Sequence, residues 1–162
     1  FRLRKLLLFW LPILLYSHLA MAQTGDPVRE QKVNPNFPRG IIIKGKVIDP
    51  IQYPKWTMMR YLMKNIDIEI IPGEEAEEYG YDEVWIYNCM QHAIDPQKII
   101  QNAKRAAPIL RLFEWIDIPA HDGHPHELTE ANLNQWIGAK GNVVSLAESG
   151  CYGKAYYGVF TQ

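Results

Sequence analysis

The alternation of β-branched runs with helix-like segments is the feature of this sequence that most constrains its fold. Four runs rich in Ile, Val and aromatic residues are typical of buried strands, at 41–48, 66–71, 82–87 and 109–116. Two segments with apolar residues at helical spacing interrupt them, at 55–64 and 95–107. Strands that alternate with helices indicate a parallel sheet, so the sequence predicts an α/β fold.

The C-terminal part of the sequence predicts an antiparallel addition to this sheet. A helix is expected at 130–136, with Thr129 as its cap. Two strand-like runs follow at 143–147 and 154–160, and the sequence ESG at 148–150 favours a hairpin between them. The predicted sheet is therefore mostly parallel, with a C-terminal antiparallel hairpin.

The first 38 residues do not follow this pattern. Basic residues and the apolar run 6–16 precede the sequence AMA at 20–22, an arrangement typical of a secretory leader. Residues 24–39 read as a linker rich in proline and asparagine. One hypothesis is therefore an exported or membrane-tethered binding domain led by residues 2–22. The other is that the apolar composition imitates a leader, because the run is short for a membrane span.

Charge and cysteine content argue against several other classes of protein. The formal net charge is −1, from 17 basic and 18 acidic residues, so no bulk attraction to nucleic acid or to an anionic membrane is expected. Cys89 and Cys151 lie in different segments without CxxC spacing. A disulfide framework or a structural zinc site is therefore not expected, and both cysteines are interpreted as intracellular thiols.

Acidic residues follow two of the predicted strands. In an open parallel sheet, ligands bind beyond the carboxyl ends of the strands. Asp49, which precedes Pro50, could accept the hydroxyl hydrogens of a ribose or could simply form a turn. Glu75 and Ala76 follow the next strand, where a carboxylate could accept the amino hydrogens of an adenine. Such an acidic run is also typical of a solvated loop.

The run YDEVWIYNCMQHAIDP, residues 81–96, changes from strand to helix within a few positions. Asn88 and Cys89 close the strand, and His92 lies just beyond them. An edge strand needs no polar groups at its carboxyl end, whereas a strand that opens onto a ligand crevice does. Asp95 then predicts the start of the next helix. His92 is a candidate for substrate contact or a structural histidine.

The sequence HDGHPHE at 121–127 concentrates polar side chains in one loop. Its histidines could bind a divalent metal, supply a general base or form a polar lid. Their spacing matches no established ligand pattern, so we expect no metal site. His124 and His126 are the candidate catalytic bases, for an acceptor that must lose a proton, and His121 is a candidate substrate contact.

Four segments together resemble a known family. They are VIDPIQYPKW, YDEVWIYNCMQHAIDPQKIIQNAKRAAPILRLFEWIDIP, HDGHPHELT and ESGCYGKAYYGVF. Over residues 41–160 they look like the later two-thirds of a class I S-adenosylmethionine-dependent methyltransferase, of the small-molecule type with a Y-N-x-x-Q-H motif. The resemblance implies a Rossmann-like sheet, S-adenosyl-L-methionine as cofactor, and methyl transfer to a small molecule.

The resemblance also implies roles for the strand-end residues. By it, Asp49 and the adjoining Pro50 would hold the cofactor ribose, and Glu75 with Ala76 would lie at the adenine. Asn88 and Cys89 would line the methionine side of the cofactor. Because the family works mostly in the cytoplasm, a cytoplasmic enzyme is expected. The alternatives are the exported or membrane-tethered binding domain and a non-catalytic, methyltransferase-like partner subunit.

The sequence departs from the family before residue 40. Family members begin with a strand that ends in a glycine-rich loop of the form D-x-G-x-G-x, whereas only Gly25 and Pro27 echo that pattern here. The sequence therefore predicts that the first strand is missing, with its place empty or filled by the apolar run 6–16. It divides the chain into an atypical N-terminal segment, 1–38, and a partial methyltransferase domain, 39–162.

Overall fold

The computed structural model describes residues 2–9, 42–145 and 153–162, and these form one α/β unit. The described strands are β1 (Arg2–Phe9), β2 (Ile42–Ile48), β3 (Ile66–Glu69), β4 (Glu83–Tyr87), β5 (Ile109–Ile116), β6 (Asn142–Ser145) and β7 (Lys154–Thr161). The described helices are α2 (Lys55–Leu62), α3 (Pro96–Ala106) and α4 (Glu130–Ile137), with the 3-10 turns η1 (Gly73–Glu75) and η2 (Met90–His92).

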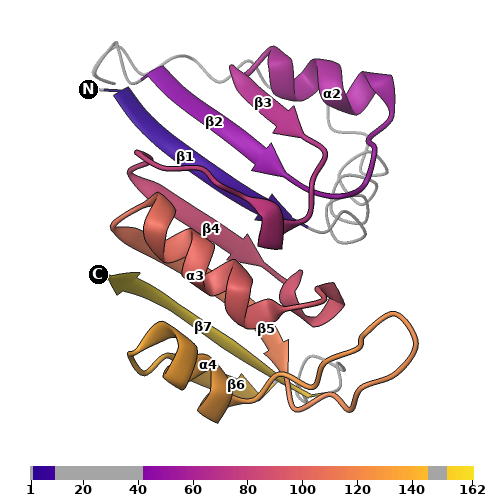
Figure 1. Cartoon of the computed structure of the whole chain (residues 1–162), viewed down its shortest axis with the longest axis vertical. Helices are drawn as coiled ribbons and strands as arrows, with labels where there is room; N and C mark the ends of the chain where they lie inside the picture. The colour runs from indigo at the N-terminus through magenta and orange to yellow at the C-terminus, as the bar shows by residue number, and fades with distance from the viewer. Residues whose placement is uncertain (1, 10–41, 146–152) are drawn as a thin grey trace, which may run out of the picture.

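All the described strands join one sheet, in the order β3-β2-β1-β4-β5-β7-β6. The pairs β1–β2, β1–β4, β2–β3 and β4–β5 are parallel, while β7 runs antiparallel to both β5 and β6. In Figure 1 the arrows of β1 to β5 point one way and the arrow of β7 points back. The predicted mostly parallel sheet with an antiparallel C-terminal pair is confirmed.

The expectation of an empty place for the first strand is wrong, whereas the alternative that the apolar run 6–16 fills it is confirmed for residues 6–9. β1 fills the central position of the sheet, where Leu8 pairs with Ile48 of β2 and with Ile86 of β4. This strand contains the basic residues and the first part of the apolar run that suggested a leader. Its sequence, RLRKLLLF, has no β-branched residue, so pairing with two neighbouring strands specifies it rather than local propensity. The proposed linker at 24–39, the AMA sequence at 20–22, the turn at 148–150 and Cys151 lie outside the described residues.

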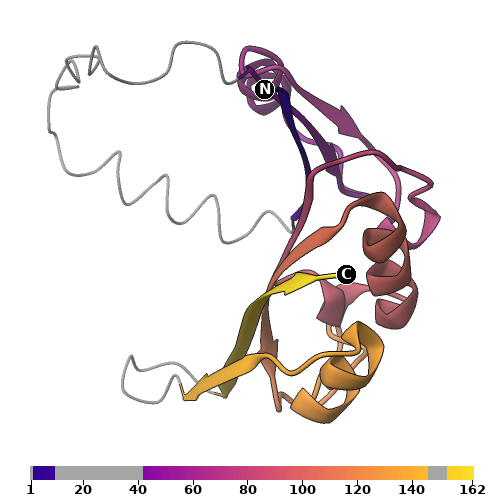
Figure 2. The same ribbon diagram turned by 90° about the vertical axis from the view of Figure 1, so that its left-hand side faces the viewer.

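The core lies between the sheet and two helices. Figure 2 shows α3 and α4 on one face of the sheet. Burial alternates along β5, where Leu110, Leu112, Glu114 and Ile116 are buried on the face that meets these helices. Apolar side chains of α3 and α4, among them Ile100 and Leu133, complete the core. This packing fixes the direction of the strands and brings the ends of β1 to β5 to one edge of the sheet.

Polar side chains cap the two helices as the sequence predicts. The Asp95 side chain accepts a hydrogen bond from the Lys98 amide at 3.0 Å, and Thr129 forms a capping box with Asn132. Gly138, at φ 82°, ends α4 in the left-handed region that glycine tolerates. Among the described residues, no helix combines the length and apolar character that crossing a bilayer requires.

Candidate functional site

The carboxyl ends of β2, β1 and β4 meet at one edge of the sheet. Asp49 directly follows β2 and Asn88 directly follows β4, with the end of β1 between them. Phe9, the last residue of β1, pairs with Tyr87, so the three ends are level. Two strand spacings separate the outer pair, roughly 10 Å in the plane of the sheet. The fold therefore brings Asp49 and Asn88 to the same rim, as the sequence predicts.

Asp49 is fully buried and already accepts two hydrogen bonds. Its Oδ1 accepts from the Ile51 amide at 2.9 Å, and its Oδ2 accepts from the Tyr53 hydroxyl at 2.7 Å. Burial raises the pKa of Asp49, and the two donors partly oppose that shift. Pro50 is exposed in the turn between the strand and these donors. The carboxylate of Asp49 thus binds a hydroxyl group within its own loop.

The turn after β4 is shaped by hydrogen bonds to β5. Asn88 has a left-handed backbone, with φ 51°, which an asparagine tolerates better than most residues. Its amide donates to the Phe113 carbonyl at 2.7 Å. The amides of Cys89 and Met90 both donate to Oε1 of Glu114, at 3.0 and 3.2 Å. Neighbouring β5 therefore receives three consecutive amides of this turn.

Sequence reasoning missed Glu114, which lies directly behind this turn. Its side chain is fully buried, and Oε2 has no hydrogen-bond partner among the residues that the structure describes. Burial raises the pKa of Glu114 to about 8, although the hydrogen bonds from Cys89 and Met90 lower it in part. Burial, the Glu114 carboxyl and Asp49, in that order, raise the pKa of Cys89.

The η1 turn, which precedes the residues predicted to meet an adenine, is held in place by hydrogen bonds from α3. Asn102 of α3 is buried, and its side-chain nitrogen donates to the carbonyls of Gly73 at 3.0 Å and Glu74 at 2.8 Å. This clamp fixes η1. The structure separates the two predicted residues, because Ala76 is buried in the core while Glu75 is exposed.

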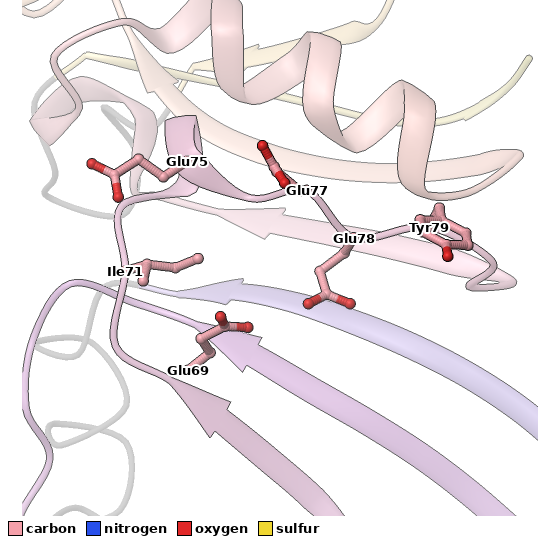
Figure 3. A pocket seen from close by; sticks show the side chains of 6 residues that line it. All are labelled: Glu69, Ile71, Glu75, Glu77, Glu78 and Tyr79. Carbon is pink, nitrogen blue, oxygen red and sulfur yellow. The ribbon is translucent and has the colours of Figure 1, made fainter.

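Glu75 lines a hollow of about 490 Å³ in the connection from β3 to β4 (Figure 3). The other lining residues are Glu69, Ile71, Glu77, Glu78 and Tyr79. Lys46 bridges two of these acids, at 2.9 Å from Glu69 and 2.6 Å from Glu78. Asp49 and Asn88 do not line this hollow, so the measured cavity and the strand-end rim are distinct features.

Three of the four predicted histidines pack together. The ring of His124 lies 4.2 Å from that of His92 and 4.4 Å from that of His121, between centroids. Nδ1 of His92 donates to the Gly123 carbonyl at 2.5 Å, which ties η2 to the loop. Burial lowers the pKa of both His92 and His124, so both rings are neutral at pH 7.

His126 lies apart from this histidine cluster of residues 92, 121 and 124. Its Nε2 donates to the Ile94 carbonyl at 2.9 Å, a bond that fastens the loop to the start of α3. By contrast, Nδ1 of His124 is buried and has no hydrogen-bond partner in the described part of the chain. Within residues 2–9, 42–145 and 153–162, no group of His, Cys, Asp or Glu side chains is arranged to hold a metal ion.

Comparison with known proteins identifies the fold. No family model matches the sequence, and neither does any curated protein. Among solved structures, a SAM-dependent methyltransferase from Aquifex aeolicus matches with a TM-score of 0.57 at 16% identity, over 97% of this chain and 81% of that one. The 1,6-didemethyltoxoflavin-N1-methyltransferase of Burkholderia thailandensis matches with a TM-score of 0.60 at 12% identity, over 99% and 72%.

A third similar structure, the [4+2]-cyclase SpnF, matches with a TM-score of 0.54 at 16% identity, over 88% of this chain and 53% of that one. These identities are low, so the likeness concerns the arrangement of the elements and not the chemistry. The strand order, the antiparallel β7 and these matches agree with the resemblance that the sequence suggested. The chain therefore has the fold of the class I S-adenosylmethionine-dependent methyltransferases.

Proposed function

We propose that this chain binds S-adenosyl-L-methionine and transfers its methyl group to a small-molecule acceptor. The observation that carries the proposal is the position of Asp49, a buried acid at the carboxyl end of β2, on the same rim as Asn88. Ligands of open α/β sheets bind at this rim. Asp49 also has the right chemistry for a ribose, since its Oδ2 already accepts a hydrogen bond from a hydroxyl group.

The other proposed cofactor contacts come from the connections that follow β3 and β4. Glu75, at the end of η1, would accept the amino hydrogens of the adenine, with Ala76 as the neighbouring backbone. Asn88 and Cys89 would line the methionine side of the cofactor, where the left-handed backbone of Asn88 turns the chain away from β4. Because Asn88 carries both an acceptor and donors, it suits an amino acid carboxylate and ammonium.

The bound cofactor would supply a methyl group on a sulfonium, ready for in-line displacement. The protein's own part is then alignment of the acceptor and exclusion of water. His92 and His121 would contact the acceptor. His124, neutral at pH 7 with a buried, unpartnered Nδ1, would take a proton from a hydroxyl or amine acceptor. His126 is the weaker candidate base, because its Nε2 is engaged with the Ile94 carbonyl.

Titration calorimetry with S-adenosylhomocysteine tests this proposal. We expect the full chain to bind this product, and Asp49→Asn to weaken binding by about tenfold, the equivalent of one charge-assisted hydrogen bond. Asp67→Asn, which changes an exposed acid on β3, is the matched control and should bind like the wild type. Wild-type protein that is folded by circular dichroism but releases no heat would reject the proposal.

One sequence observation favours a second candidate, a non-catalytic partner subunit with a methyltransferase fold. No glycine occurs between Phe9, where β1 ends, and Gly25, although the family places its glycine-rich loop directly after this strand. This candidate predicts a folded protein with no affinity for S-adenosylhomocysteine. The same calorimetric experiment therefore separates the two candidates.

A further inference from the structure

The exit of the chain from β4 depends on one buried side chain of the next strand. Asn88 ends the regular ladder, with its amide bonded to the Phe113 carbonyl. The next two amides, those of Cys89 and Met90, point at Oε1 of Glu114 rather than at a backbone carbonyl. After Asn88, the Glu114 side chain therefore replaces the β5 backbone as the acceptor for the amides of the chain that leaves β4.

Glu114 holds this position at an energetic cost. It occupies a core position of β5, in line with Leu110, Leu112 and Ile116, and its side chain is fully buried. Within residues 2–9, 42–145 and 153–162, Oε2 has no hydrogen-bond partner, and a buried polar atom without a partner destabilises a fold. An apolar residue at this position would remove that cost, but it would also leave two buried amides without an acceptor.

We propose that Glu114 is a positioning residue, whose Oε1 sets the backbone of the Asn88–His92 turn in the form that receives the cofactor and the acceptor. This inference rests on the function proposed above. It adds a residue that lies behind the ligand-contacting turn and acts on ligands only through it.

The contacts of the turn explain how its backbone controls the site. The Asn88 side chain accepts a hydrogen bond from Gln91 Nε2 at 3.3 Å, so the two ends of the turn hold each other. His92, the last residue of η2, bonds to Gly123 and contacts the His124 ring. A shift of the Cys89 and Met90 amides would therefore move the predicted cofactor contact at Asn88 and the predicted acceptor contact at His92 together.

Two substitutions distinguish the acceptor function of Glu114 from its other properties. Glu114→Gln keeps an oxygen acceptor of the same reach, whereas Glu114→Met has a similar length and no acceptor. Glu83→Gln is the matched control, because Glu83 is the other buried acid of this pair of strands and lies at the opposite end of β4. All variants are compared at a temperature where circular dichroism shows them folded.

The measurements are residue-resolved amide exchange by NMR and the dissociation constant for S-adenosylhomocysteine. In Glu114→Met we expect exchange at Cys89 and Met90 to accelerate by about tenfold, while the amides of β1 and α3 are unchanged, and binding to weaken by about tenfold. Glu114→Gln should stay within about threefold of the wild type in both. Glu83→Gln should change neither.

Three results would overturn the inference. One is a folded Glu114→Met variant with wild-type exchange at Cys89 and Met90. Another is an equal acceleration throughout the sheet, which would mark Glu114 as a general stabilising residue. The third is a Glu114→Gln variant as impaired as Glu114→Met, since the acceptor would then not be the property that matters. If the wild type binds no S-adenosylhomocysteine, the proposed function fails, and the exchange measurements still decide whether Glu114 positions the turn.

Discussion

Asp49 shows at the scale of one residue how a buried carboxylate at a strand end is satisfied by its own loop. A buried carboxylate needs donors, and Tyr53 supplies one from within the same loop. Tyr53 is itself buried, and burial followed by the bond to Asp49 raises its pKa, so its hydroxyl keeps its proton. In this pair the neutral Tyr53 hydroxyl is the donor and the Asp49 carboxylate is the acceptor.

Removing that donor should destabilise the fold in a pH-dependent way. In Tyr53→Phe we expect a loss of about 1–3 kcal/mol in the free energy of unfolding at pH 7, because a buried carboxylate loses a hydrogen bond. Burial raises the pKa of Asp49 above its ordinary 3.8, so its contribution is most favourable at low pH and is lost as pH rises. The loss should therefore be smaller at pH 4. Urea denaturation measures both, and an equal loss in Tyr61→Phe would contradict the assignment to this bond.

Glu114 also makes a pH-dependent contribution to the free energy of unfolding, over a wider range of pH than Asp49. Its pKa rises from an ordinary 4.5 to about 8 in the folded protein, so stability from this group is complete below pH 4.5 and is lost as pH rises toward 8. At about 1.4 kcal/mol per pH unit the total is on the order of 5 kcal/mol. Glu114→Gln should abolish this loss, so its advantage over the wild type in urea denaturation should grow between pH 5 and pH 9. A constant difference would show that Glu114 is charged throughout.

Single residues also show what the sequence could and could not predict about the site. Asp49 and Asn88 were predictable because they end apolar strands, and the end of a parallel strand is a ligand position. Glu114 lies inside a strand and reads as a solvent-facing residue. Its position in the strand could have indicated burial, because every second residue of β5 faces the core and Glu114 falls in the same series as Leu110, Leu112 and Ile116. That it bonds to the neighbouring turn follows only from strand pairing.

At the scale of elements, the loop 117–129 is fastened to the turn after β4 chiefly by histidines. His92 bonds to Gly123 and His126 bonds to Ile94, while the His124 ring packs edge to face against that of His92. Burial, and then the neighbouring histidine rings, lower the pKa of His92 and of His124 below the ordinary 6.5, although the bond to Gly123 opposes this shift for His92. A lowered histidine pKa means that protonation favours the open form, so the contribution is present above pH 6.5 and is lost as pH falls.

We therefore expect acid to release this loop before it affects the sheet. Hydrogen-exchange protection factors for residues 120–127 should fall between pH 7 and pH 5.5, while those of α3 stay constant. His124→Phe retains a ring in the cluster but cannot be protonated, so its loop should lose less protection over the same range. Loop protection that is independent of pH in the wild type would argue against the histidine contacts as the fastening.

The elements that were predicted from sequence share one property, which β1 lacks. β2, β4 and β5 carry β-branched or aromatic runs that proline, glycine or acidic residues delimit, so their local sequence and their place in the sheet agree. The caps Asp95 and Thr129 gave the helix starts in the same way. β1 has a basic start and a leucine run, which are equally typical of a leader. Only pairing on both sides makes it a strand.

At the scale of the whole molecule, β1 joins two halves that are otherwise separate along the sheet. β2 and β3 lie on one side of it, and β4, β5, β7 and β6 lie on the other. Asp49 belongs to the first half and Asn88 to the second. The spacing of the two proposed cofactor contacts therefore depends on a strand that contributes backbone hydrogen bonds to both halves.

This arrangement predicts that a single amide at the centre of β1 decides whether the molecule folds as one unit. Leu7 pairs with Val47 and with Trp85, and in a central strand every amide takes part in a ladder bond. Leu7→Pro removes that amide, and we expect a loss of about 3 kcal/mol or more, with separate urea transitions for the two halves. Leu7→Val keeps the amide and should unfold in one transition. In a variant that retains only Trp85 of the five tryptophans, fluorescence reports the β4 side, while far-ultraviolet circular dichroism reports both halves. Coincident transitions after Leu7→Pro would mean that the halves cooperate through other contacts.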